Sequence, residues 1–110
     1  MLTIDGNNNI TLTRGDTLTL TVGLTKDGET YTPEEGDVIR FALARGYLGE
    51  PGYDFKLDKT IPNDTLTFTL SSTETALDYR AYNYDIQVTH DDGCVDTFIS
   101  ARFTIVGEVK

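Results

Sequence analysis

The fold of this chain is decided by the stretch Thr17-Leu18-Thr19-Leu20-Thr21-Val22-Gly23-Leu24. Its leucine and valine side chains occupy every second position, separated mainly by threonine. Strict alternation places all the apolar side chains on one face of an extended segment and the threonines on the other. β-Branched residues such as threonine also favour strands. The stretch therefore predicts a β-strand with one face buried in a core and the other exposed to water.

The same alternation recurs along the rest of the chain. In Thr65–Leu70 the inward set is Leu66, Phe68 and Leu70. Further strands are predicted at Leu2–Ile4, Ile10–Leu12, Ile39–Leu43, Phe55–Leu57 with Ile61 after it, Tyr82–Val88 and Val95–Ile105. In the last of these, every second residue from Val95 to Ile105 is expected to face the core. Because that segment is long, we expect a bulge or bend near Ser100-Ala101.

Turn signals separate these runs. Lys26-Asp27-Gly28-Glu29 and His90-Asp91-Asp92-Gly93 each contain Asp-Gly, which favours tight β-hairpins. Ser71-Ser72-Thr73-Glu74 has the pattern of a capping box, so one short helical turn is expected near residues 71–77. Tyr82 stands at the start of a long predicted strand, a position that suits a tyrosine corner.

These patterns predict one all-β domain spanning residues 1–110. The length of 110 residues suits a single β-sandwich. Regularly spaced short strands with almost no helix favour an immunoglobulin-like antiparallel sandwich over a barrel, with Greek-key connections and about seven to nine strands. Hydrophobic residues make up 38% of the chain, and their ordered placement argues against disorder.

The charge balance narrows the set of partners. Asp and Glu number 18 against 9 Lys and Arg, which gives a formal net charge of -9. A surface this acidic repels phosphate groups, so neither nucleic acid nor an anionic membrane is an expected partner. The charge promotes solubility, and it also permits docking onto a basic protein surface.

Cysteine usage and the first residues bear on location. Cys94 is the single cysteine, so no intrachain disulfide can form, which fits folding in a reducing compartment. Met1-Leu2-Thr3 does not lead into the basic and apolar segments of a signal peptide, and no apolar run approaches membrane-spanning length. We therefore expect synthesis and folding in the cytoplasm.

No catalytic site is predicted. His90 is the only histidine, and Cys94 lies across the same predicted hairpin, but no third residue is evidently placed to orient the histidine as a base. Glu34-Glu35-Gly36-Asp37 clusters carboxylates on a loop, which does not supply two acids facing each other across a cleft. Both regions are therefore interpreted structurally, as residues flanking a turn and as a solvated loop.

No cofactor or metal site is predicted either. Asp5-Gly6-Asn7-Asn8-Asn9 begins like a calcium loop, but Ile10 replaces the required glycine and Asp16 stands where glutamate is needed. A polar Asx-type turn is the preferred interpretation. Arg14-Gly15-Asp16 spells an integrin-binding tripeptide, which would need a protruding loop. A turn between two strands accounts for the same residues.

The loop Gly46–Tyr53 is among the regions most open to a binding role. It is glycine-rich and contains Tyr47, Glu50 and Tyr53. These residues are the candidate contacts with a ligand or partner, since tyrosine offers a large contact area at low entropic cost. The alternative, which we favour for the two tyrosines, is that they cover one end of the sandwich.

Several segments together resemble a known group of proteins. In order they are ITLTRGDT (10–17), EGDVIRFA (35–42), KTIPND (59–64), YDIQV (84–88) and DGCVDTFI (92–99). They resemble short prophage-encoded proteins from tail and baseplate gene regions, and the immunoglobulin-like N-terminal domain of phage upper-baseplate proteins. The shared motifs mark strand register and turns rather than chemistry.

The resemblance implies a sandwich that docks to other phage tail proteins, often in symmetric oligomers, and it brings no catalytic residues. It also implies assembly in the bacterial cytoplasm followed by a place in the virion tail or baseplate. The expected function is a non-catalytic structural or adaptor protein of a (pro)phage tail or baseplate. The alternative is a free-standing sandwich that recognises carbohydrate or a cell surface through residues 46–53.

Overall fold

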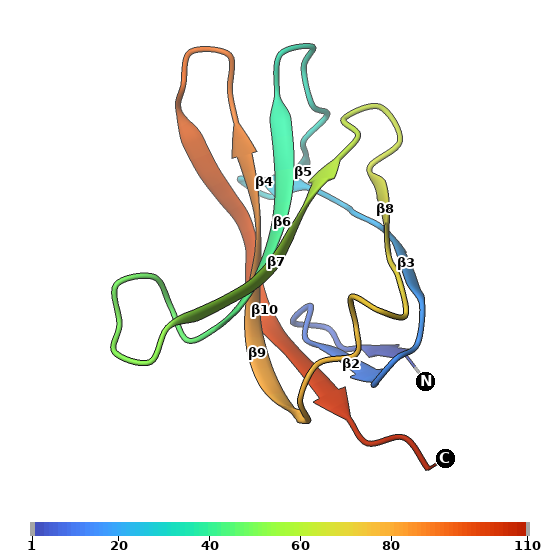
Figure 1. Ribbon diagram of the computed structural model, residues 1–110. Coiled ribbons are helices and arrows are strands. Elements are labelled where there is room, and N and C mark those ends of the chain that lie inside the picture. Colours follow the sequence, from blue (N-terminus) through green and yellow to red (C-terminus); the bar gives the residue numbers. More distant parts are fainter. Residues whose placement is uncertain (1, 110) are drawn as a thin grey trace.

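The computed structural model describes residues 2–109, which form strands, turns and loops (Figure 1). The largest sheet contains β1 (Leu2–Ile4), β2 (Ile10–Thr13), β6 (Val38–Arg45), β7 (Asp54–Ile61), β9 (Arg80–Thr89) and β10 (Val95–Val106). β3 (Leu18–Thr21) pairs with β8 (Thr67–Leu70), and β4 (Thr25–Lys26) pairs with β5 (Glu29–Thr30). Residues 2–109 thus contain ten strands, more than the expected number, and the additional pair is the short β4–β5 hairpin at Asp27-Gly28.

The six strands of the large sheet follow the order β1-β2-β10-β9-β6-β7. β2 runs parallel to β10, with Ile10 opposite Phe103 and Leu12 opposite Ile105. The other neighbouring strands of this sheet are antiparallel. β2 therefore lies between β1 and β10, the last strand of the chain.

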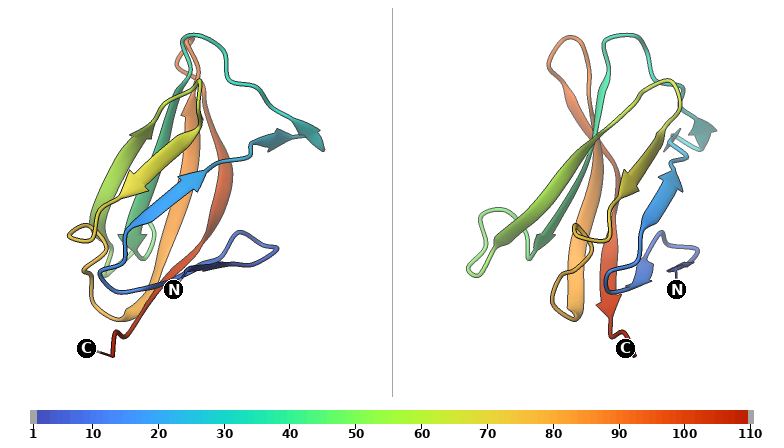
Figure 2. Two further views of the ribbon diagram at one scale, coloured as in Figure 1. Left: turned by 90° about the vertical axis from the view of Figure 1, so that its right-hand side faces the viewer. Right: turned by 45° about the vertical axis from the view of Figure 1, so that its right-hand side comes forward.

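β3, which pairs with β8 to make the second layer, covers only the middle of the strand predicted at 17–24. It ends at Thr21, although Val22 and Leu24 are still buried. The two strands lie across one face of the large sheet (Figure 2). On their outer side, the hydroxyl oxygens of Thr19 and Thr69 lie 3.0 Å apart, and those of Thr21 and Thr67 lie 2.8 Å apart. These cross-strand hydrogen bonds fix the register that directs the leucine side chains inward.

The core lies between the two layers. Phe41 on β6 is 0% exposed, and its ring centroid lies 5.0 Å from that of Phe68 on the small sheet. Phe41 also packs against Tyr84 and Phe103 within the large sheet. The expected all-β sandwich is confirmed, whereas its narrower assignment as immunoglobulin-like stays a prediction.

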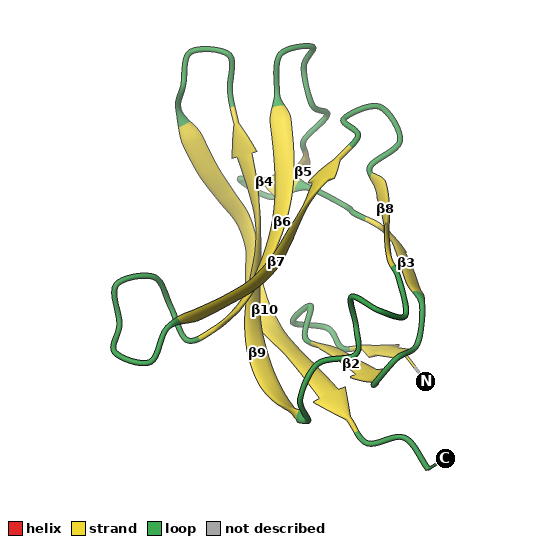
Figure 3. Cartoon of the chain, in the orientation of Figure 1, coloured by secondary structure: helices red, strands yellow, loops and turns green. Residues whose placement is uncertain are grey.

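The chain between β8 and β9 forms a hydrogen-bonded turn and no helix (Figure 3). The predicted capping box is present: the Ser71 backbone N–H donates to the Glu74 carboxylate at 2.9 Å, and the Glu74 N–H donates to the Ser71 hydroxyl at 3.2 Å. A bond of 3.1 Å from the Thr75 N–H to the Ser71 carbonyl closes one turn. The cap therefore stabilises an isolated turn, and residues 76–79 connect it to β9.

The β-bulge in β10 lies closer to the β9–β10 hairpin turn than predicted. The register with β9 shifts between Thr97 and Ile99, so the bulge lies at Phe98 and not at Ser100-Ala101. The expected inward set is therefore wrong before the bulge: Val95 is 54% exposed, whereas Phe98 packs against the core. One extra residue reverses the faces of a strand, which places Asp96 on the same side as buried Val88.

β8 is also shorter than predicted. It begins at Thr67, because Leu66 adopts a φ of 56°, a left-handed conformation that interrupts a strand. The Leu66 carbonyl accepts a hydrogen bond of 2.8 Å from the Val22 N–H, and its side chain still packs against the core. Leu66 therefore keeps its inward role while ending the regular ladder.

The predicted tyrosine corner is present. Tyr82, on β9, is buried, and its hydroxyl donates a hydrogen bond of 2.9 Å to the carbonyl of Asp78. Tyr82→Phe removes this bond and leaves the ring in place. We expect the free energy of unfolding to fall by about 1 kcal/mol, measured by urea denaturation. Tyr79→Phe, at an exposed tyrosine, is the control, and an equal loss in both variants would contradict the role of the corner.

Candidate functional site

The first candidate site is a polar cluster at the hairpin end of the large sheet. His90 directly follows β9, and Asp37 directly precedes β6. The two connecting loops lie side by side in all views (Figures 1 and 2). The Asp37 carboxylate lies 3.0 Å from His90 Nδ1, and the Asp96 carboxylate lies 2.8 Å from His90 Nε2. His90 therefore lies between two carboxylates that are far apart in the sequence.

Asp37 is the buried centre of this cluster, with a side chain that is only 3% exposed. Its carboxylate accepts a hydrogen bond of 2.5 Å from the Tyr31 hydroxyl and one of 2.9 Å from the Glu34 N–H. The expectation of a solvated Glu34–Asp37 loop is thus wrong for Asp37. The side chain turns inward because Tyr31 and His90 offer donors that satisfy its charge.

The electrostatics of the cluster follow from these bonds. Hydrogen bonds from Tyr31 and the Glu34 backbone hold the pKa of Asp37 below its usual value, despite its burial. The Asp37 carboxylate raises the pKa of Tyr31 to about 12. Hydrogen bonds to Asp96 and Asp37 raise the pKa of His90. The cluster therefore favours a protonated His90 flanked by two ionised carboxylates.

This arrangement holds the loops before β6 and after β9 together with the start of β10. Both ring nitrogens contact carboxylates. Cys94 is exposed, and the adjacent Asp92 carboxylate raises the pKa of its thiol, which disfavours the reactive thiolate. Asp96 also pairs with Lys26 at 3.3 Å, which ties the β4–β5 hairpin to β10.

The raised pKa of His90 makes stability depend on pH. Protonated His90 is stabilised in the folded chain, so this contribution is complete below about pH 6.5, the pKa of an unfolded histidine. It is lost as the pH rises through the higher folded pKa of His90. We expect the melting temperature to fall on going from pH 6 to pH 9, as measured by circular dichroism. The His90→Gln variant should lose this dependence, and an unchanged pH profile in that variant would contradict the assignment.

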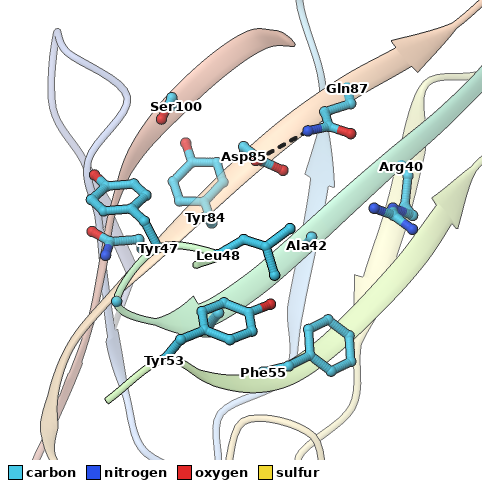
Figure 4. Close-up of a pocket in the computed structure, with 13 residues that line it drawn as sticks. Arg40, Ala42, Tyr47, Leu48, Tyr53, Phe55, Tyr84, Asp85, Gln87 and Ser100 are labelled. Carbon is cyan, nitrogen blue, oxygen red and sulfur yellow. Dashed lines mark hydrogen bonds between the residues drawn. The ribbon is translucent and has the colours of Figure 1, made fainter. Parts of the chain in front are cut away.

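The second candidate site is a hollow on the outer face of the large sheet, opposite the core. Its floor contains the small side chains of Ala42, Ala44 and Ser100. Tyr47, Leu48, Tyr53 and Phe55 stand around it, and Asp85 lies within it (Figure 4). The volume of the hollow is about 160 Å³. Short side chains in the middle of the sheet and large ones at the loop thus create the concavity.

We call this concavity the outer-face hollow. Asp85 is the acidic residue that lines it. It lies on β9, between Ala42 on β6 and Ser100 on β10. Its Oδ1 atom is buried and has no hydrogen-bond partner among residues 2–109, while Oδ2 accepts a long bond of 3.4 Å from Gln87. Burial raises the pKa of Asp85, and the opposing attraction of Arg40 is the weaker effect. The carboxylate is therefore poorly compensated.

The structure places the three predicted contact residues differently. Tyr47 and Tyr53 both line the outer-face hollow, whereas Glu50 does not. The Glu50 carboxylate accepts a hydrogen bond of 2.9 Å from the Tyr47 N–H, which closes the loop. The tyrosines thus lie at the outer face of the sheet near its end, and their contact with a ligand or partner stays a prediction.

Sequence reasoning missed two parts of these sites. From the sequence alone, no role is predicted for Asp85 or for Ala42. Ala42 was the available signal for a hollow, because outward positions of a central strand usually carry larger polar side chains. Pairing Ala42 with Asp85 required the strand order, which the sequence does not state.

The remaining motifs are local turns. The Asp5 carboxylate accepts bonds of 2.9 Å from the N–H groups of both Asn7 and Asn9, as an Asx-type turn requires. Within residues 2–109, no cluster of three or more His, Cys, Asp or Glu side chains is arranged to hold a metal ion.

Arg14-Gly15-Asp16 is a turn in which Gly15 has a φ of 81°. The Arg14 side chain bonds to the Leu77 carbonyl at 3.0 Å and to Glu108 at 3.2 Å. The arginine is therefore held against the fold and does not lie on a protruding loop, as integrin binding would need.

Comparisons with protein-family models, with curated proteins and with solved structures give no match to this chain. In the part of the chain that the structure describes, no helix has the length and apolar character needed to cross a membrane.

Proposed function

We propose that this chain is a non-catalytic structural or adaptor protein of a (pro)phage tail or baseplate, acting through protein–protein contacts. The phage context rests on the sequence resemblance alone. The mode of action rests on the outer face of the large sheet, which presents large apolar side chains to solvent. On the proposed assembly route, the chain folds in the bacterial cytoplasm and is then built into the virion.

The exposed apolar face is the observation that supports binding to other proteins. Val38 and Val95 flank Thr89 on neighbouring strands, and each valine is more than half exposed. Tyr47, Leu48 and Phe55 are exposed at the other end of the same face. Large exposed apolar side chains on one sheet face often mark a contact site for another protein.

Co-expression with the products of the neighbouring genes tests this proposal. We expect one of them to co-purify as a complex of defined mass in size exclusion with light scattering. Val38→Glu combined with Val95→Glu places two charges on the apolar face, and the complex should be lost. Leu2→Glu combined with Ile4→Glu is the matched control, since these exposed apolar side chains lie on the edge strand β1.

A complex that survives the Val38 and Val95 changes would contradict the use of this face. The absence of a complex with any neighbouring gene product would contradict the adaptor function itself. Light scattering of the chain alone, across concentration, also reports whether the face binds a second copy.

A ligand-binding sandwich is the second candidate function, and the outer-face hollow is the observation that favours it. Tyr47 and Tyr53 stand beside polar groups there, and this combination suits carbohydrate. Binding on a glycan array that is abolished by Tyr47→Ala and by Tyr53→Ala would support this function over the adaptor.

A further inference from the structure

We propose that the outer-face hollow binds one cationic side chain, a lysine or an arginine, presented by the partner protein, with Asp85 as its anionic acceptor. This inference rests on the proposed function, since it names the chemistry of the partner at that face. It assigns the recognition role to Asp85, with the surrounding aromatic side chains as walls.

The size of the hollow fits a side chain better than a larger ligand. Its volume of about 160 Å³ lies well below the roughly 300–1,000 Å³ of pockets that hold small-molecule ligands. A single extended side chain can enter such a space while the rest of its protein remains outside. The flanking apolar side chains, Leu48 and Phe55, would then contact the surface around it.

The Asp85 carboxylate in the hollow favours a cationic ligand. Asp85 has one buried oxygen without a donor and a second with only the long bond from Gln87. Arg40, the cation that lines the hollow, pairs with Asp58 at 3.8 Å on the neighbouring strand β7. No hydrogen bond from Arg40 to Asp85 is present among residues 2–109, so the carboxylate keeps few donors, and a cation from outside would compensate its charge.

The surroundings favour a cation over a neutral donor. Tyr47, Tyr53 and Phe55 line the hollow, and aromatic faces attract ammonium and guanidinium groups. The chain as a whole has a formal net charge of -9, which steers basic surfaces toward it. Local and overall charge thus select the same kind of partner.

Asp85 should consequently favour binding at the expense of stability. Removing its charge with Asp85→Asn keeps the shape of the side chain and ends the burial of a poorly compensated carboxylate. We expect the melting temperature of this variant to be equal to or higher than that of the unaltered chain. A folded, stable variant then makes any loss of binding interpretable.

The test uses the full chain, labelled with ¹⁵N, and capped tripeptides with a central lysine or arginine. Both should produce saturable shifts confined to the amides around the hollow, with a weak, roughly millimolar affinity. Asp85→Asn should weaken the binding roughly tenfold or more. Asp64→Asn is the matched control, because it makes the same charge change in the exposed turn between β7 and β8, and it should bind as the unaltered chain does.

A tripeptide with central glutamine distinguishes charge from size, and a methyl glycoside tests the carbohydrate alternative. Equal binding of the glutamine peptide, undiminished binding by Asp85→Asn, or binding of the glycoside alone would each overturn the proposal. The titration needs no natural partner. Its failure beside an intact complex in the co-expression experiment therefore refutes the cation site and leaves the adaptor function standing.

Discussion

Replacing Phe41 by alanine is expected to lower the free energy of unfolding by about 3–5 kcal/mol, the usual cost for a buried phenylalanine. Phe41 joins the two layers, since its ring centroid on the large sheet lies 5.0 Å from that of Phe68 on the small sheet. Its ring packs against Phe68 on the small sheet, Tyr84 on the adjacent strand β9 and Phe103 on β10. The close packing on all sides prevents the neighbours from filling the space, so both burial and dispersion contacts are lost.

Urea denaturation followed by circular dichroism measures this loss. Phe55→Ala is the matched control, since Phe55 is a phenylalanine in the adjacent strand β7 but is 50% exposed on the outer face. Its replacement should cost much less, because little packing is removed. Comparable losses in the two variants would show that Phe41 is not the centre of the core. A marginally stable chain would leave Phe41→Ala unfolded without denaturant, which agrees with the prediction.

Asp37→Ala is the polar change with the largest expected effect, a loss of about 2–4 kcal/mol in the free energy of unfolding. The substitution removes the acceptor for the Tyr31 hydroxyl, the Glu34 N–H and His90 Nδ1. These donors are partly buried, so water replaces the carboxylate only incompletely. The Glu34–Asp37 turn and the loop after β9 lose their shared contact at the same time.

A second measurement separates this mechanism from general destabilisation. Asp37 is one of two carboxylates that raise the pKa of His90, so Asp37→Ala should lower that pKa toward its usual value. His90 is the only histidine, and its ring signals can be followed by NMR against pH without ambiguity. Asp91→Ala, at an exposed carboxylate of the same hairpin, should change the stability by less than about 0.5 kcal/mol. An unaltered His90 titration in Asp37→Ala would contradict the hydrogen-bonded cluster.

Short-range patterns were sufficient for the strands and their turns. Alternation from Thr17 to Leu24 predicts the strand and its buried face, because both depend on the two-residue period of an extended chain. The Asp27-Gly28 turn is equally local: both residues have positive φ, of 54° and 82°, as this hairpin turn requires. The tyrosine corner of Tyr82 spans only four residues. Each of these features is determined by neighbours in the sequence.

Both candidate sites depended on contacts that the sequence does not specify. His90 and Asp37 are separated by 53 positions, and the loops that hold them meet because β6 and β9 are adjacent. The position of the bulge was a second obstacle. Val95 and Ile99 fit the same alternating face as Ala101 and Phe103, so the pattern gave no sign that Phe98 would turn inward and place Asp96 on the core side.

The parallel pairing of β2 with β10 has a consequence for how the chain folds. Ile10 and Phe103 are partners across almost the entire sequence, whereas β6–β7 and β9–β10 are hairpins that close locally. Closing so long a loop costs more chain entropy, and contacts of this range slow folding. We expect the hairpins to form first and β2 to join last. During synthesis on the ribosome, β2 therefore cannot pair with β10 until Val106 has emerged. A nascent chain that stalls earlier keeps an open sheet edge, which a chaperone or a second chain can occupy.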